Sequence, residues 1–231
     1  MKILMLTDKM DIGGAETHIL TLIEELSALG ADITLMTSGG VYAENNLKNI
    51  VRTVYLPLDK RDMKSILKSK RAIREALPFF DVIHAHTRFT AFISKSARGR
   101  IKYPPIVTTA HLDFPTFPFG PLTYWGERTL AVSRDIEEHL IRKYRVGGER
   151  IMTTRNSIDY SIFTPGQERE KLIIHTSRID KDRSRTAFML TEAAKTILKN
   201  HRDWRILIAG TGDMYTKLYK AVGITNKTLG F

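Results

Sequence analysis

The sequence of 231 residues contains no cysteine. This absence excludes disulfide bonds, thiol nucleophiles and metal sites built on cysteine, and it is typical of proteins of the reducing cytoplasm. The sequence also lacks any run of about 18 consecutive apolar residues, so it predicts no membrane-spanning helix. The first short apolar run ends before Asp8 and Lys9, and we therefore expect no export signal.

Patterns typical of specific nucleic-acid binding are missing as well. There is no zinc-finger spacing, no aromatic RNA-binding strand and no glycine-rich RNA clamp. The formal net charge of +11 nevertheless predicts an anionic partner. Charge alone does not choose between a nucleotide, a phospholipid surface and a nucleic acid bound without sequence preference. A generic basic nucleotide- or RNA-binding protein therefore stays open as a weaker alternative.

What is present is an alternation of short apolar runs with longer segments of helical period. This alternation is typical of an α/β protein whose parallel strands are joined by crossover helices. Residues 15–29 carry apolar side chains on one helical face, and Gly30 stands at the usual stop position. The strands predicted in this part of the chain are residues 2–7, 32–37, 51–56, 82–86, 106–110, 129–132 and 150–154.

The alternation breaks at Thr164-Pro165-Gly166, which predicts a linker. We expect an amino-terminal Rossmann-like domain over residues 1–165 and the first part of a second Rossmann-like domain over residues 166–231. The second part is predicted to hold strands at 172–176, 205–209 and 228–231, and helices at 187–199 and 213–222. Because this is half of a doubly wound domain, we expect an exposed sheet edge that favours self-association or a mobile carboxyl-terminal third.

Two glycines follow the first predicted strand and lead directly into the first helix. Gly13 and Gly14 let the backbone approach a phosphate closely, and the exposed amides of a helix start attract anions. The alternative is a tight turn that needs glycine and binds nothing. A glycine pair is weaker evidence than the full dinucleotide fingerprint, so both interpretations stay open.

Histidines end two of the predicted strands. His84 and His86 lie on one face of their strand, because side chains alternate between the two faces. His111 follows the next strand in the same way, where an imidazole can contact a sugar hydroxyl or carry a proton. A metal site needs a third ligand that the sequence does not offer, so we predict a substrate-facing or a hydrogen-bonded structural role and no metal.

Cations and glycines follow the strands of the second part. Arg178 comes directly after its first strand, and Arg183 lies close behind, so together they can neutralise a diphosphate; a solvated basic turn is the alternative. Gly210 and Gly212 form another turn between a strand and a helix, which suits a nucleotide cleft but is weak evidence alone. The following Asp213 has the alternative role of capping the helix.

Two further segments have an alternative between binding and packing. The aromatic side chains after His111 either stack on an acceptor or lipid or pack beneath the cleft; they are Phe114, Phe117, Phe119, Tyr124 and Trp125. Residues 62–77 form a predicted helix with Met63, Ile66, Ile73 and Leu77 on one side and lysines and arginines elsewhere. Such a helix either lies on an anionic membrane surface or covers the sheet with its charges in water.

The order of the motifs resembles the group 4 glycosyltransferases, and the resemblance extends over essentially the whole chain. The motifs that carry it are Gly13-Gly14-Ala15-Glu16, His84-Ala85-His86, Thr108-Thr109-Ala110-His111, Ala131-Val132-Ser133, Asn156-Ser157-Ile158-Asp159 and Ser177-Arg178-Ile179 with Arg183. Each motif is loose by itself, and their succession is more specific.

The resemblance implies a GT-B fold and an activity. The family transfers a sugar from a nucleotide-activated donor, a UDP- or GDP-sugar, to a glycan or lipid-linked acceptor, with retained anomeric configuration and no required metal. By this resemblance Gly14 contacts the donor diphosphate, His111 faces the transferred sugar, and Arg178 and Arg183 hold the departing diphosphate. Cations at that place stabilise the charge that grows on the leaving phosphate.

Further residues are assigned to the candidate site. Glu16 and His86 belong to the substrate side, and Gly13, Gly210 and Gly212 belong to the nucleotide-binding turns. Family habit also suggests polysaccharide biosynthesis in the cytoplasm, with peripheral contact to the inner face of the membrane.

The sequence departs from the family at two places. The family usually has lysine where Arg183 stands, which keeps the charge but alters the geometry. The family's Glu-x7-Glu segment belongs beyond Phe231, so we expect a truncated chain that needs a partner supplying the missing half. The alternative function is a non-catalytic remnant that binds an acceptor or a partner protein.

Overall fold

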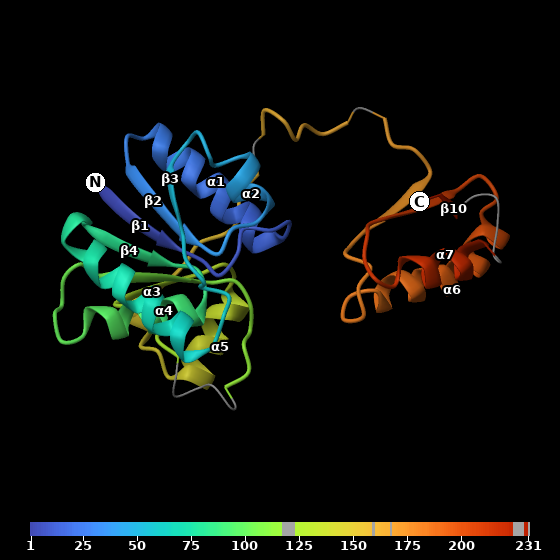
Figure 1. Ribbon diagram of the computed structural model, residues 1–231. Helices are drawn as coiled ribbons and strands as arrows, with labels where there is room; N and C mark the ends of the chain where they lie inside the picture. Colours follow the sequence, from blue (N-terminus) through green and yellow to red (C-terminus); the bar gives the residue numbers. More distant parts are fainter. Residues whose placement is uncertain (117–122, 159, 167, 224–228, 231) are drawn as a thin grey trace. The chain divides into compact units, whose positions relative to one another are not determined.

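The computed structural model describes residues 1–116, 123–158, 160–166, 168–223 and 229–230. They form two compact units, Met1–Ser157 and Ile158–Phe231, and both are of the predicted α/β class (Figure 1). The segment Thr164-Pro165-Gly166, where the sequence places the domain boundary, lies between the last strand of the first unit and the first strand of the second. The described residues between these two strands form no helix or strand.

The first unit is built on a seven-stranded sheet in the order β3-β2-β1-β4-β5-β6-β7, with every neighbouring pair parallel. The strands are β1 (Lys2–Leu6), β2 (Asp32–Thr37), β3 (Arg52–Tyr55), β4 (Val82–Ala85), β5 (Ile106–Ala110), β6 (Arg128–Ala131) and β7 (Ile151–Thr153). All seven strands predicted from the sequence are confirmed, and their ends differ from the prediction by no more than one residue. The order reverses between β1 and β4, as in the doubly wound nucleotide-binding folds.

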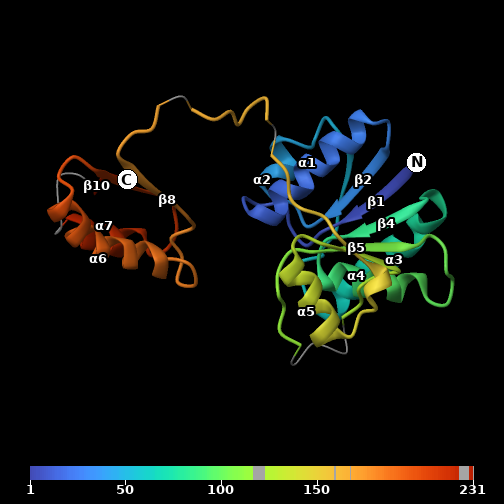
Figure 2. The same ribbon diagram turned by 180° about the vertical axis from the view of Figure 1, so that it is seen from behind.

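Helices cover both faces of this sheet. They are α1 (Gly14–Ala28), α2 (Val41–Asn45), α3 (Met63–Ala76), α4 (Arg88–Arg98) and α5 (Arg134–Tyr144). Met5 of β1 packs with Ile19 and Ile23 of α1, whereas Leu4 faces the other way and packs with Ile93 of α4. Figures 1 and 2 show the result: α1 and α2 lie on one face, and α3, α4 and α5 on the other. The two-residue alternation of the strands therefore builds two separate cores.

The helix predicted at residues 62–77 forms as α3, and Asp62 caps it by accepting a hydrogen bond from the Ser65 amide at 3.0 Å. Ile73 and Leu77 are buried as expected. Met63 is not: its side chain is 70% exposed, and Leu67 one turn later is 57% exposed. Met63 and Leu67 therefore lie outside the core, whereas Ile66 packs against it as predicted.

The second unit has a three-stranded parallel sheet in the order β10-β9-β8. Its elements are β8 (Leu172–Thr176), α6 (Arg185–Asn200), β9 (Arg205–Ala209), α7 (Tyr215–Gly223) and β10 (Leu229–Gly230), which confirms the predicted alternation. Ile208 of β9 packs with Ala187 of α6 and Leu218 of α7, so both helices cover the same face. On the opposite face Ile174 stands next to Leu207 and is 57% exposed.

None of the described helices is both long and apolar enough to cross a membrane.

Candidate functional site

The candidate site of the first unit lies at the carboxyl ends of the strands, where the strand order reverses. β1 leads into the turn before α1, β4 leads to His86, and β5 leads to His111. In open parallel sheets, ligands bind in the crevice beside this reversal, because the two connecting helices depart to opposite faces and leave a gap. The elements that the sequence singled out for binding therefore meet at one end of the sheet.

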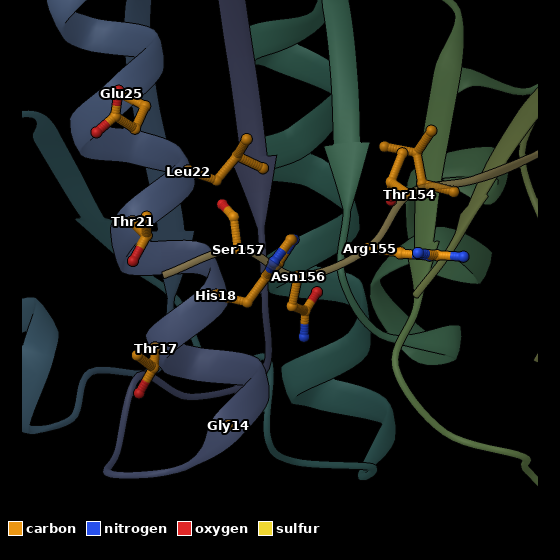
Figure 3. A pocket seen from close by; sticks show the side chains of 11 residues that line it. Gly14, Thr17, His18, Thr21, Leu22, Glu25, Thr154, Arg155, Asn156 and Ser157 are labelled. Carbon is orange, nitrogen blue, oxygen red and sulfur yellow. The ribbon is translucent and has the colours of Figure 1, made fainter. Parts of the chain in front are cut away.

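A cavity of about 510 Å³ opens beside α1 (Figure 3). One wall is a stripe of α1, and the other is the segment that follows β7. The lining residues are Gly14, Thr17, His18, Thr21, Leu22, Glu25, Leu130, Thr154, Arg155, Asn156 and Ser157. The Asn156-Ser157 motif thus lies at the cavity. Asp159 of that motif lies outside the described residues.

The start of α1 is open toward this cavity. Gly13 precedes the helix in an extended conformation, and no side chain caps the first helical amides. A Cβ atom added to Gly14 would have no other atom within 4 Å, so the absent side chain leaves space beside the backbone. Uncapped amides at the positive end of a helix dipole attract an anion. At Gly14 the fold itself does not require glycine, which favours the binding interpretation over the tight turn.

Gly13 and Glu16 make a different local arrangement. A Cβ atom at Gly13 would lie 2.3 Å from Oε2 of Glu16, so the glutamate carboxylate folds over Gly13. Glu16 is half-buried and does not line the cavity. Its negative charge lies in the first turn of α1, where it stabilises the helix dipole. The predicted substrate-side role of Glu16 stays a prediction.

Imidazole rings gather at the ends of β4 and β5. His84 and His86 lie on one face of β4 with ring centres 4.1 Å apart, as the alternation predicts. Nδ1 of His86 is 3.4 Å from Nε2 of His111. A third ring comes from α1: the centre of His18 is 5.1 Å from that of His111 and 6.2 Å from that of His86. His18 was not identified from the sequence. It supplies the third imidazole that a metal site with His86 and His111 would need.

Burial keeps these imidazoles uncharged at neutral pH. Burial, together with the neighbouring histidines, lowers the pKa of His84 to about 3 and that of His111 to about 4. Burial also lowers the pKa of His18, and it lowers the pKa of His86 well below its ordinary value. An uncharged imidazole has one nitrogen that donates and one that accepts. The floor of the site is therefore polar and neutral.

Hydrogen bonds fix the loop after β1 against the start of α4. Thr87 donates its hydroxyl hydrogen bond to Oδ1 of Asp8 at 2.7 Å, and Arg61 donates to Oδ2 at 2.5 Å. The guanidinium of Arg61 lies over the ring of Phe89, 3.7 Å from its centre. Thr87 and Thr90 form a capping box at the start of α4. These contacts hold His86, the residue before Thr87, in place.

The aromatic segment after His111 packs against the protein where it is described. Trp125 is buried in a core with Ala110 and Ala131, and its ring centre is 5.2 Å from that of Tyr144. Phe114 lies under the guanidinium of Arg88, 4.4 Å from ring centre to Cζ. Tyr124 donates to the Glu127 carboxylate. Phe117 and Phe119 lie outside the described residues.

The second unit brings its predicted cations together. Arg178 and Arg183 each lie 3.5 Å from the carboxylate of Asp180, and both are more than half exposed. A single carboxylate therefore holds two guanidinium groups at the end of β8, and their combined charge stays positive. This arrangement suits recognition of a diphosphate. Neither group is committed to a buried structural ion pair.

Gly210 and Gly212 have a structural reason to be glycine. Both have positive φ angles, of 158° and 157°. A Cβ atom would lie 1.9 Å from the Ser177 carbonyl oxygen at Gly210, and 2.3 Å from that of Ile179 at Gly212. The turn after β9 therefore packs directly on the turn after β8, beside a cavity of about 520 Å³ that both glycines line. α7 begins at Tyr215, so Asp213 does not hold the capping position directly before it.

A family model described as Glycosyltransferase Family 4 matches residues 12–162. That segment spans the start of α1, the histidine cluster and the cavity-lining residues after β7. No curated protein sequence matches the chain.

Solved structures share the fold over the whole chain. A glycosyltransferase from Rickettsia africae is 17% identical, with a TM-score of 0.72; the match covers all of this chain and 67% of the other. Anabaena Alr3699/HepE, solved with UDP-glucose, is 14% identical, with a TM-score of 0.76 and 69% of its chain covered. The lipopolysaccharide outer core galactosyltransferase WaaB is 15% identical, with a TM-score of 0.69 and 68% covered. The fold of this chain is therefore of the GT-B kind.

Proposed function

Since the chain belongs to Glycosyltransferase Family 4, we propose that it moves a sugar from a nucleotide-sugar donor to a glycan or lipid-linked acceptor, with retained anomeric configuration. The similar Anabaena protein was solved with UDP-glucose, which favours a UDP-sugar as the donor. Polysaccharide assembly in the cytoplasm is the setting that we propose for this transfer.

The observation that carries the proposal is the open start of α1. Gly14 lines the cavity beside α1, no side chain caps this helix start, and open space lies beside the Cα atom of Gly14. Such a helix start is suited to a phosphate, because it supplies donors and a positive field without a side chain. The donor diphosphate is proposed to bind there.

The histidine floor is proposed to bind the transferred sugar. The half-buried His111 and the buried His86 are uncharged, so each offers a donor and an acceptor to sugar hydroxyls. Uncharged imidazoles also do not repel the positive charge that develops on the sugar ring as the glycosidic bond breaks. Arg178 and Arg183 are proposed to stabilise the negative charge on the leaving diphosphate.

Titration calorimetry with UDP, GDP and UDP-glucose tests the donor site, and a transfer or hydrolysis assay with the same chain tests the chemistry. We expect saturable binding that His111→Ala and Arg178→Ala weaken, and a rate that either variant lowers roughly 10²–10³-fold. Arg142→Ala, an exposed arginine of α5, is the matched control. Binding of an acceptor glycan without any binding of nucleotides would instead support the non-catalytic binding module.

The first half of α3 is proposed to touch an anionic membrane surface. Met63 and Leu67 are exposed there, and Lys64, Lys68 and Arg71 are exposed beside them. Exposed apolar side chains among cations are typical of helices that lie in the headgroup region. This contact would bring the protein to a lipid-linked acceptor.

The face of the second sheet opposite α6 and α7 is proposed to bind protein. Ile174 is 57% exposed on the edge strand β8, and its neighbour on that face is Leu207. An exposed apolar edge favours pairing with another chain. The occupant is either a second copy of this chain or a partner chain.

A further inference from the structure

Three imidazole rings from three separate elements converge at the end of the sheet. His18 comes from α1, His86 from the end of β4 and His111 from the end of β5. One ring nitrogen of each lies within 4.8 Å of the other two. These rings are far apart in sequence, yet their nitrogens converge on one place. Such a convergence is suited to binding one metal ion.

One of the three pairs of nitrogens has the spacing of a tetrahedral site, and all three nitrogens lie within 4.8 Å of one another. With Zn–N bonds of about 2.0–2.1 Å, two ligand nitrogens of a tetrahedral zinc site lie about 3.4 Å apart. Nδ1 of His86 and Nε2 of His111 already have this separation, 3.4 Å. The ring planes of His18 make angles of 60° and 71° with those of His86 and His111, so the three rings are not simply stacked.

His86 also has an unused nitrogen. Its side chain is 4% exposed, and its Nε2 atom is buried without a hydrogen-bond partner among the described residues. When Nδ1 of His86 binds an ion, the ring proton stays on Nε2, so this atom is not a ligand and the site depends on Nδ1. The fourth ring, His84, is not available in the same way, because its Nε2 is 2.8 Å from the hydroxyl of Thr109.

From this convergence we propose that His18, His86 and His111 bind a divalent transition-metal ion, with Zn²⁺ as the expected ion. Imidazole nitrogen suits Zn²⁺ and related ions, whereas Mg²⁺ and Ca²⁺ require oxygen ligands. Three protein ligands leave a fourth position for water, as in zinc sites of the open kind. His18 lines the cavity, so that position is accessible from it.

This site does not rest on the proposed transfer of sugar. It replaces the sequence-based expectation of no metal, which was made because a third ligand was missing. Since His86 and His111 are also proposed to contact the sugar, the ion and the donor sugar would exclude each other. Zn²⁺ would then lower the affinity for a nucleotide-sugar without lowering that for the free nucleotide to the same degree.

The test uses the full chain without a histidine tag, freed of metal with a chelator. Titration with Co²⁺, read by its visible absorption, reports the coordination geometry, and competition with a zinc indicator gives the affinity for Zn²⁺. We expect one ion per chain with tetrahedral Co²⁺ absorption. His18→Gln and His111→Gln should each weaken binding by more than the roughly 10–100-fold that loss of a supporting residue costs.

The matched control is His201→Gln, which removes an exposed histidine at the end of α6 and should leave the affinity unchanged. Circular dichroism of every variant checks that it is folded. Absence of saturable binding in the unmodified chain would overturn the proposal. So would binding of equal affinity in the His18 and His111 variants, because the ion would then be held elsewhere. Nucleotide binding is measured separately in the presence of a chelator, so that failure of the metal site and failure of the proposed donor site can be distinguished.

Discussion

The guanidinium of Arg98 donates two hydrogen bonds to the carboxylate of Glu127, at 2.7 and 2.9 Å, at the amino end of β5. The Arg98 side chain is only 7% exposed, while that of Glu127 is 42% exposed. The same carboxylate accepts a hydrogen bond from the backbone amide of Ile106 at 2.6 Å. One carboxylate therefore joins the end of α4 to the start of β5. This contact lies at the amino ends of the strands, whereas the candidate site lies at their carboxyl ends.

Replacing Glu127 should lower the stability of the first unit. In Glu127→Gln the buried guanidinium loses its charged partner, and we expect a loss of about 1.5–3 kcal/mol in the free energy of unfolding. Partial exposure of Glu127 keeps the effect below that of a fully buried pair. Urea unfolding measures it. Glu138→Gln, in an exposed pair with Arg142, is the control and should cost about 0.2–1 kcal/mol.

The stability difference should also depend on pH. Burial alone would raise the pKa of Glu127, but the hydrogen bonds from Arg98, Tyr124 and Ile106 outweigh it and lower the pKa to about 2. Since the unfolded chain has a pKa of about 4.3, the stabilisation is complete above that pH and is lost as the pH falls toward 2. The gap between the original chain and Glu127→Gln should therefore narrow from pH 5 to pH 2. A gap that stays constant would contradict the lowered pKa.

A methyl group at Gly14 should separate binding from stability. Gly14→Ala adds a Cβ into open space at the start of α1, so the thermal midpoint should stay the same or rise slightly. The added methyl group should lower the affinity for UDP-glucose roughly tenfold, about 1.4 kcal/mol, because it blocks close approach of a diphosphate to the backbone. Calorimetry measures the affinity for UDP-glucose, and thermal unfolding measures the midpoint.

The control for Gly14 is Gly148→Ala, which does not line the cavity and where a Cβ would meet only a side-chain atom of Ile141 at 3.9 Å. It should leave nucleotide affinity unchanged. If Gly14→Ala binds UDP-glucose as tightly as the original chain, the open start of α1 is not the diphosphate site.

Charges on the first half of α3 should control binding to anionic vesicles. Replacing Lys64, Lys68 and Arg71 together by Gln removes about 1 kcal/mol each, so we expect roughly 100-fold weaker sedimentation with phosphatidylserine vesicles at low salt. The same three changes at Arg142, Lys143 and Arg145 of the α5 region are the charge-matched control. If both sets of changes weaken vesicle binding equally, binding depends on the net charge of the protein and not on α3.

Self-association should depend on the face of the second sheet that carries Ile174. Light scattering of the original chain is expected to give a mass above the 26.3 kDa of one copy, and Ile174→Ser should shift it toward that value. Met189 on α6 is an apolar residue of similar exposure, and Met189→Ser should leave the measured mass unchanged. A monomer at all concentrations would mean that this face is covered by a different protein or by none.

The strands could be predicted from the sequence because parallel strands buried on both faces are short apolar runs, and 106–110, for example, is predicted to the residue. The two histidines of β4 could be placed on one face from alternation alone. His18 could not be found in this way, because its role depends on the distance between α1 and the end of β4. A signal does exist: Gly14, His18 and Thr21 follow each other at helical spacing and put small and polar groups on a face that should meet the sheet.

The glycines show the opposite limit of sequence reasoning. Gly14 and Gly212 look alike in sequence, since each stands between a strand and a helix. The structure separates them, because a side chain at Gly14 has open space whereas one at Gly212 would collide with the Ile179 carbonyl. Only the second depends on a neighbour that is distant in sequence, and no local pattern encodes that contact.

The central position of β1 has a consequence for synthesis of the chain. β1 leaves the ribosome before β4, which is one of its two neighbours in the sheet, and the amide of Lys2 donates to Asp81 across 79 positions. The middle of the sheet cannot close until those residues have emerged, which takes roughly 4–16 s at about 5–20 residues per second. During that interval Ile3, Leu4, Met5 and Leu6 are an apolar strand without one partner. We infer that residues 3–6 of the nascent chain need protection until β4 has emerged.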